Sequence, residues 1–376
     1  MPRRIKDYLI ILSAGLCFST AVPAIPPSGP GHFNLLSRAS SVQLESQLSK
    51  VQRQWLQNRR ELVLGTAFPD YPPFDLTSSG RDYEGLTADY AGLLSKALAL
   101  PVKVLRYPSR EAAIRALEAG DIDLLGSSNG FEAANLNLIL SEPYAVDRPV
   151  LVTREGETRS LSDGLAGMRL ALVYHYLPLG EVEKLYPEAI IRAYPSYQNA
   201  LNAVAFDQAD VFLGDTISTH YMINKGYLKN IRMANFGKHE AYGFSFAMRQ
   251  HDHTLLSIVD AVLRAVPTNE REAIAKRWSA GSDILLTDQK LQLTLREERW
   301  LKDNPVVTVI VNETFAPLTF FDADGNFRGI TADLLELIRL RTGLRFSVQR
   351  GRDVNAMIDQ VAAQKIDMIG AIVPSN

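Results

Sequence analysis

The sequence is poor in cysteine, carries almost no net charge and has no long apolar run beyond its first residues. Its one cysteine, Cys17, allows neither an internal disulfide nor a cysteine-based zinc site. The net charge of −2 gives no basic excess that would favour a nucleic-acid backbone, so we expect no nucleic-acid partner. Hydrophobic residues make up 46% of the 376 positions, which is typical of a globular chain of two or three domains.

The N-terminus has the pattern of a secretory signal peptide. Residues 3–6 include three positive charges, residues 9–18 are apolar but too few to span a bilayer, and residues 22–24 offer a cleavage site. We therefore predict a signal peptide over residues 1–24 and export to the periplasm, with an uncleaved membrane anchor as the alternative. A mature chain without cysteine suits that oxidising compartment.

Residues 25–61 are predicted to form a lead-in and an amphipathic helix. Proline and glycine are frequent over residues 25–31, which indicates a flexible segment. Over residues 42–60 the apolar side chains recur with helical spacing, and Ser40 or Ser41 is a candidate N-cap.

The most informative feature is an internal duplication. Residues 62–132 match residues 306–376 at a constant offset of 244, and the sequence GLTAD at 85–89 returns as GITAD at 329–333. A unit of about 245 residues therefore begins twice, and the second copy is incomplete in this sequence.

Strands and helices alternate within the unit, which predicts parallel α/β sheets. In the first part we expect strands at 63–66, 102–107 and 122–126 with helices at 89–100 and 109–119. After residue 153 the same alternation resumes and continues to residue 278. We expect two lobes joined by extended crossings near residues 150 and 246, with a ligand cleft at the strand ends.

Several short motifs together resemble the bacterial solute-binding proteins of family 3. They are Tyr71-Pro72-Pro73-Phe74, Gly85–Asp89, Gly120–Asp123, Ser141–Tyr144, Gln208–Val211 with Asp215, and Ala273-Ile274 with Trp278. The resemblance implies an α/β fold, a bilobed periplasmic-binding-protein-like domain of type II (a Venus flytrap), followed by a partial second copy. The implied divisions are 1–24 signal peptide, 25–61 lead-in, 62–285 first flytrap (lobe 1 62–150 and 247–285, lobe 2 151–246), 286–305 linker helix and 306–376 partial second flytrap.

Two flytraps in tandem after a signal peptide resemble the periplasmic region of BvgS/EvgS-type hybrid sensor histidine kinases. The resemblance implies a non-catalytic sensory module that detects a small molecule by lobe closure, with a homodimer in the full-length protein. The kinase, and any membrane segment other than an uncleaved signal, would lie outside this sequence. A binding protein of an ABC transporter for amino acids or related solutes is the alternative, and an enzyme on this fold is a third interpretation.

The resemblance also suggests where a ligand would bind. In amino-acid-binding members an arginine about seven residues before the Ser-x-Pro-Tyr motif holds the ligand carboxylate. Here that position is Ala134, and residues 130–140 contain no cation. The acidic residue that takes the ligand ammonium falls on Asp215, for which ligand binding and capping of the next helix stay open.

The remaining candidates for ligand binding are aromatic and hydroxyl side chains. Tyr71, Phe74 and Tyr144 are expected as walls of the cleft, with plain packing as the alternative. Ser127 and Ser128 follow a strand, where a turn is the alternative. We predict no catalytic residue, no cofactor and no metal site, because the histidines near residue 251 lack further ligands at metal-binding spacing.

Overall fold

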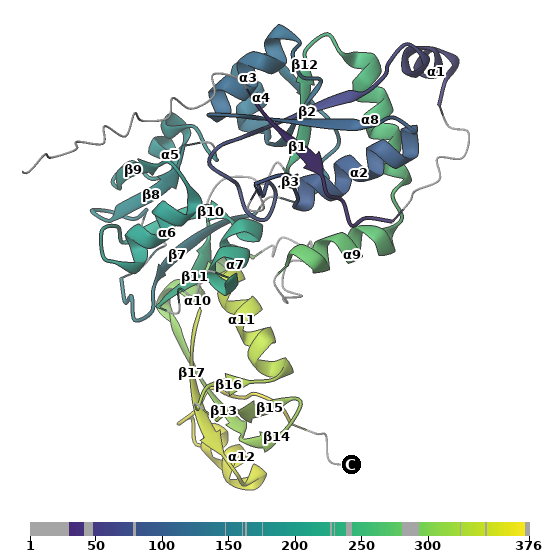
Figure 1. Ribbon diagram of the computed structural model, residues 1–376. Coiled ribbons are helices and arrows are strands. Elements are labelled where there is room, and N and C mark those ends of the chain that lie inside the picture. Colours follow the sequence, from purple (N-terminus) through teal and green to yellow (C-terminus); the bar gives the residue numbers. More distant parts are fainter. Residues whose placement is uncertain are drawn as a thin grey trace, which may run out of the picture.

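The computed structural model contains three α/β bodies (Figure 1). We call them lobe 1 (residues 31–146 and 244–278), lobe 2 (149–237) and the C-terminal unit (294–369). The structure describes residues 30–40, 48–77, 80–146, 148–159, 161, 164–174, 176–225, 228, 230–237, 243–279, 293–323, 325–342 and 344–372. The predicted signal peptide therefore lies outside the described residues. Within these ranges, the helices are all too short or too polar to span a bilayer.

Lobe 1 is built on a seven-stranded sheet with the order β3-β1-β4-β2-β5-β12-β6. Its strands are β1 (Gly31–Leu35), β2 (Leu62–Ala67), β3 (Asp82–Tyr83), β4 (Val102–Tyr107), β5 (Leu124–Ser128), β6 (Leu138–Leu140) and β12 (Ser245–Arg249). Strand β2 pairs in parallel with β4 and with β5. The carboxyl ends of these strands therefore meet at one edge, where loops can reach a second lobe.

The helices of lobe 1 are α1 (Lys50–Gln57), α2 (Leu86–Leu98), α3 (Arg110–Ala119), α4 (Gly130–Leu136), α8 (His253–Ala265) and α9 (Thr268–Trp278). Local sequence explains where two of them begin. Ser109 caps α3 by accepting from the Ala112 amide. Gly85 precedes α2 with φ of 129°, and a Cβ there would lie 2.2 Å from the Phe74 carbonyl oxygen, so only glycine fits.

Lobe 2 contains a five-stranded sheet with the order β11-β7-β10-β8-β9. Its strands are β7 (Pro149–Arg154), β8 (Arg169–Val173), β9 (Ile190–Tyr194), β10 (Val211–Asp215) and β11 (Ile231–Phe236). Its helices are α5 (Leu179–Leu185), α6 (Tyr197–Ala205) and α7 (Thr216–Lys225). The central strand β10 is buried along its whole length, and Asp215 at its end faces lobe 1.

The two crossings between the lobes run side by side, because Ala145 forms an antiparallel bridge with Phe244. The expected boundary of lobe 2 at residue 246 is wrong by a few residues. Strand β12 already begins at Ser245 and pairs with β5 and β6, so it belongs to lobe 1.

The C-terminal unit has a parallel sheet with the order β17-β13-β18 and a small antiparallel sheet with the order β14-β15-β16. These strands are β13 (Val306–Asn312), β14 (Thr314–Phe315), β15 (Thr319–Phe321), β16 (Phe327–Arg328), β17 (Arg345–Gly351) and β18 (Met368–Ile369). The helices are α10 (Leu295–Asp303), α11 (Ile330–Thr342) and α12 (Val354–Ala362). This order of strands and helices repeats the beginning of lobe 1.

The structural repeat has a one-residue shift that the gap-free alignment missed. Leu62 in β2 pairs with Val102, the first residue of β4, and Val307 in β13 pairs with Phe346. Phe346 lies 244 positions after Val102, whereas Val307 lies 245 positions after Leu62. Strand β13 therefore follows β2 at an offset of 245, whereas Pro73 and Pro317 are 244 apart. The second copy has one residue fewer in the loop between its first strand and this proline.

The segments before each copy also differ from the expectation. Residues 31–35 of the lead-in form β1, which inserts between β3 and β4. Helix α1 begins at Lys50 and not near residue 42, because Ser49 caps it in a reciprocal capping box with Gln52. The linker helix is likewise shorter than 286–305, since α10 begins after the N-cap Thr294. Residues 41–47 and 280–292 lie outside the described part of the chain.

Candidate functional site

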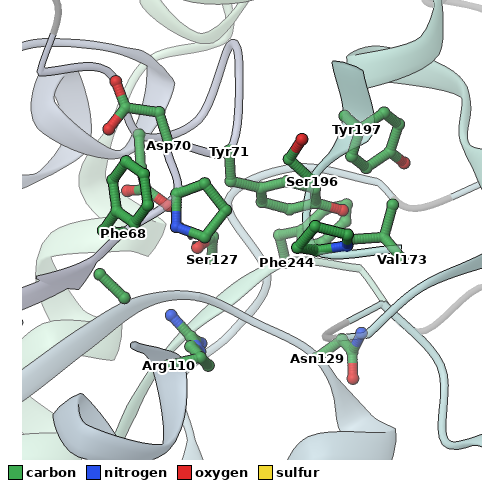
Figure 2. A pocket seen from close by; sticks show the side chains of 14 residues that line it. Phe68, Asp70, Tyr71, Arg110, Ser127, Asn129, Val173, Ser196, Tyr197 and Phe244 are labelled. Carbon is green, nitrogen blue, oxygen red and sulfur yellow. Dashed lines mark hydrogen bonds between the residues drawn. The ribbon is translucent and has the colours of Figure 1, made fainter. Parts of the chain in front are cut away.

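A narrow cavity lies between the lobes, at the carboxyl ends of β2 and β5 (Figure 2). Lobe 1 contributes the loop after β2, with Phe68 to Tyr71, together with Arg110, Ser127 and Asn129. Lobe 2 contributes Val173, Pro195, Ser196 and Tyr197. The free space is about 40 Å³, which is room for only a few water molecules. The lobes are therefore almost closed on each other in this structure.

Asp215 is the central carboxylate of this region and is fully buried. Its Oδ1 accepts from the Ser218 amide at 2.7 Å and so caps the start of α7. Its Oδ2 accepts from the hydroxyl of Tyr71 at 2.8 Å and from that of Tyr197. Burial raises the pKa of Asp215 above its ordinary value, and these hydrogen bonds oppose that shift. The carboxylate therefore serves both as a helix cap and as a contact between the lobes.

Tyr71 provides the contact from lobe 1. Its backbone pairs with that of Asp75 through two hydrogen bonds, which fix the loop after β2. Its ring lies 5.2 Å from the ring of Tyr197 in lobe 2 and 5.5 Å from Phe74 behind it. The Tyr71 hydroxyl thus occupies the position on Asp215 that a donor group of a ligand would need.

Asn129 makes a second direct bond between the lobes, which the sequence analysis did not find. Its Nδ2 donates to the carbonyl oxygen of Tyr176 at 2.8 Å, while its Oδ1 caps α4 by accepting from the Glu132 amide. The pattern of an asparagine before a helix signals the cap. It gives no sign of the partner in lobe 2.

The lobe 1 side of the cavity contains a buried acid. Asp75 accepts from the hydroxyls of Ser127 and Tyr83, and burial raises its pKa above the ordinary value. Ser127 lines the cavity, but its hydroxyl proton is already directed to Asp75. Its φ of 49° places it in the left-handed region, as in a tight turn at a strand end.

A buried cation lies close to the position where the sequence predicted none. Arg110 on α3 donates through Nε and Nη2 to both oxygens of Glu132, and through Nη1 to the Gly126 carbonyl oxygen. Burial alone would lower its pKa, but the Glu132 carboxylate raises it above the usual value. Residues 130–140 indeed contain no cation, but the sequence analysis missed Arg110, which reaches the site from another helix. This arginine is already neutralised by Glu132.

Four of the six predicted ligand-binding residues do not line the cavity. Phe74 is fully buried, 4.3 Å from the ring of Phe244. Ser128 accepts from Arg110 behind the cavity wall. The hydroxyl of Tyr144 accepts from the Ser127 amide at 2.7 Å, inside lobe 1. The positions of Phe74 and Tyr144 support the packing alternative. Tyr71 and Ser127 line the cavity, and Asp215 lies directly behind it.

A larger hollow of about 280 Å³ lies on the other side of the crossings, between α2, α7 and α9. Its walls are mainly apolar, and its Arg271 caps the end of α8 by donating to the carbonyl oxygens of Leu263 and Val266. We place the candidate site in the smaller cavity, because buried polar groups of both lobes converge there. No cluster of three potential metal-ligating side chains occurs in the described ranges.

The comparisons with known proteins agree with this arrangement. The family model of the bacterial extracellular solute-binding proteins, family 3, matches residues 62–281 and again residues 307–376. The virulence sensor protein BvgS of Bordetella bronchiseptica is 40% identical over 364 residues, which are 97% of this chain and 29% of that protein. The sensor protein EvgS of Escherichia coli O157:H7 is 26% identical over 80% of this chain and 25% of its own length. This chain therefore spans less than a third of these relatives.

Two further relatives differ in how much of this chain they match. The crystal structure of the B. pertussis BvgS periplasmic domain superposes with a TM-score of 0.73 at 40% identity, over 92% of this chain and 67% of that one. The arginine-binding periplasmic protein of Mannheimia haemolytica is 23% identical and covers only 57% of this chain, although 89% of that protein is matched. The bilobed α/β fold with a second copy, predicted from the sequence, is thus confirmed.

Proposed function

Since this chain belongs to the bacterial extracellular solute-binding proteins of family 3, we propose that it is the periplasmic, solute-sensing part of a membrane-bound sensor kinase. The observation that carries the proposal is the tandem arrangement, because both units of the chain have counterparts in one periplasmic sensor structure. The arginine-binding periplasmic protein, a single-unit relative, accounts for only 57% of this chain. The sensing step would be a population shift in which a solute favours one arrangement of the lobes.

The intact gene product offers the direct test of this role. Tyr71→Phe and Asp215→Asn should change ATP-dependent autophosphorylation in membrane vesicles, because both alter the contact between the lobes. Equal phosphorylation in the wild type and both variants would contradict the sensor proposal, as would a complete lack of phosphorylation in the wild type. The homodimer implied by the resemblance stays a prediction, and size-exclusion chromatography with light scattering tests it.

The charges of the cleft restrict the class of solute. Asp215 and Asp75 offer buried carboxylates, whereas Arg110 and Arg106 are already paired with Glu132 and Asp70. A ligand rich in hydrogen-bond donors, such as an amine, could replace the Tyr71 hydroxyl on Asp215. A ligand carboxylate would first have to displace Glu132 from Arg110. We therefore propose that the first flytrap prefers donor-rich or cationic solutes to free α-amino acids.

Isothermal titration calorimetry with a panel of α-amino acids and matching amines without the carboxylate measures this preference. We expect no tight binding of the amino acids, because the described cleft has no arginine left to pair with the carboxylate. A dissociation constant of about 1 μM for any α-amino acid, which corresponds to about −8 kcal/mol, would contradict the proposed class.

Removal of one hydroxyl should open the lobes. Tyr71→Phe keeps the ring packing but removes a hydrogen bond to a buried carboxylate, which is worth about 1.5–3 kcal/mol. The ratio of open to closed molecules should rise by about tenfold or more, since 1.4 kcal/mol corresponds to a factor of ten. Small-angle X-ray scattering should show a larger radius of gyration.

Tyr107→Phe is the matched control for this variant, because Tyr107 packs within lobe 1 alone. Identical scattering from the Tyr71→Phe variant and the wild type would show that the hydroxyl does not hold the lobes together.

A further inference from the structure

The contact between lobe 2 and the C-terminal unit has no part in the proposed solute site. Helix α11 contacts β11, the outer strand of the lobe 2 sheet (Figure 1). Arg339 on α11 donates through Nη1 to the carbonyl oxygen of Ala234 at 2.9 Å and through Nη2 to that of Met233. Only 8% of Arg339 is exposed. A buried guanidinium thus joins two bodies whose contacting residues are 105 positions apart.

Strand β11 offers these acceptors for two reasons. It is an edge strand, so one side of its backbone has no neighbouring strand in the sheet. Its register against β7 also shifts between Met233 and Asn235, and Ala234 has no partner residue on β7. The bulge directs two consecutive carbonyl groups to the same neighbour. Arg339 satisfies both of them.

A second side chain of α11 holds the guanidinium in place. Glu336 accepts from Nε of Arg339 at 2.7 Å and also from its Nη2. All three nitrogens of the guanidinium therefore have acceptors. A planar fork with five donors can serve two carbonyl groups and a carboxylate at once, which a lysine ammonium cannot do in this geometry.

The duplication shows that these two side chains are special to the second copy. The positions in α2 that correspond to Glu336 and Arg339 are Gly92 and Ser95. Gly92 lets the lead-in approach, because a Cβ there would lie 2.1 Å from the Ser37 hydroxyl oxygen. The same helix face thus receives an extended segment of chain in both copies. In the second copy that segment is β11, and an ion pair replaces the glycine and the serine.

The covalent connection and the buried contact attach the C-terminal unit to different lobes. The chain leaves lobe 1 after α9, which ends at Trp278, and enters the C-terminal unit at Thr294. The Arg339 contact, by contrast, is made with lobe 2. We propose that Arg339 clamps the C-terminal unit to lobe 2, so that this unit moves with lobe 2 when the lobes change their arrangement. The lobe motion is taken from the proposed function, whereas the clamp itself needs no solute.

Distances between spin labels test the clamp in the whole chain with Cys17→Ser. Labels are attached at exposed positions by Glu118→Cys in lobe 1, Gln198→Cys in lobe 2 and Asp359→Cys in the C-terminal unit. Double electron–electron resonance should give a single narrow distribution for the pair 198 and 359. Arg339→Met should broaden that distribution. It should also raise amide hydrogen exchange in β11 by about tenfold, the loss expected for charged hydrogen bonds.

Two further variants separate the clamp from a general loss of stability. Arg339→Lys keeps the charge but not the fork, so it should broaden the same distribution while the protein stays folded. Arg352→Met is the control, because Arg352 is exposed and pairs with Glu313 within the C-terminal unit. A narrow distribution in both Arg339 variants, or a broad one in the wild type, would overturn the proposal. A narrow 198–359 distribution in the wild type that Arg339→Met broadens, together with a distance between labels 118 and 198 that no solute of the calorimetric panel alters, would support the clamp and contradict only the sensor function.

Discussion

Replacement of Asp215 by alanine is expected to lower the free energy of unfolding of the first flytrap by about 3–5 kcal/mol. The substitution leaves the hydroxyls of Tyr71 and Tyr197 and the Ser218 amide without their acceptor in a fully buried place. It also removes the N-cap of α7, which contributes about 0.5–2 kcal/mol. Urea denaturation followed by circular dichroism measures the change.

Asp215→Asn is the matched variant, since it keeps the shape and one acceptor oxygen. It should retain the helix cap but place an amide donor near the two tyrosine hydroxyls, so we expect a smaller loss of about 1–2 kcal/mol. A change of less than about 1 kcal/mol for Asp215→Ala would show that these hydrogen bonds do not form in solution. If both variants lose the same stability, the charge of Asp215 matters more than the cap.

The second large effect is expected at Asp89 on α2, which is fully buried. Its carboxylate accepts from the Arg38 amide at 2.6 Å, from Trp278 Nε1 at 2.9 Å and from Arg277. One side chain thus ties the lead-in, α2 and α9 together. Asp89→Ala should lower the free energy of unfolding by about 3–5 kcal/mol, because the donors of Arg38 and Trp278 lose their acceptor. Urea unfolding followed by tryptophan fluorescence reports the loss.

The duplication supplies a matched control at the corresponding position of the second copy. Asp333 also lies in the first turn of a 13-residue helix, but it is exposed. Asp333→Ala therefore removes the same favourable interaction with the helix N-terminus without breaking a buried network. We expect a change within about 0.5 kcal/mol for this variant. Equal losses from Asp89→Ala and Asp333→Ala would mean that the buried contacts of Asp89 contribute nothing.

The repeat and the fold class could be predicted from the sequence, because both depend on local patterns. Alternating strands and helices follow from hydrophobic periodicity, and Gly85 and Gly329 indicate the two equivalent helix starts. The one-residue shift in β13 escaped the alignment, since apolar strand residues match about equally well in either register. Strand β1 was not predicted from the sequence either. Its five residues show no clear alternation, and its place was decided by pairing with β3 and β4.

The candidate site could be predicted only in part. The sequence placed Asp215 at the cleft, since an acid after a buried strand must lie at a strand end. It left capping and ligand binding as alternatives. The structure has the cap, and the second carboxylate oxygen accepts from Tyr71 of lobe 1, because the two oxygens of one carboxylate can serve different donors. Ligand binding by Asp215 stays a prediction. Tyr71 was expected as a wall, but its bond to Asp215 spans 144 positions of sequence. No spacing rule predicts such a pair.

The sequence by itself determined the family, the duplication and the position of the cleft, because those features are recorded as short motifs in a fixed order. Only the tertiary structure decided which charges remain available. Arg110 is neutralised by Glu132 from another helix, and Arg339 is directed to the edge of lobe 2 by a bulge in β11. The physical reason is that buried charges and unpaired backbone groups must find partners wherever folding brings them. Those partners are neighbours in space and not in sequence.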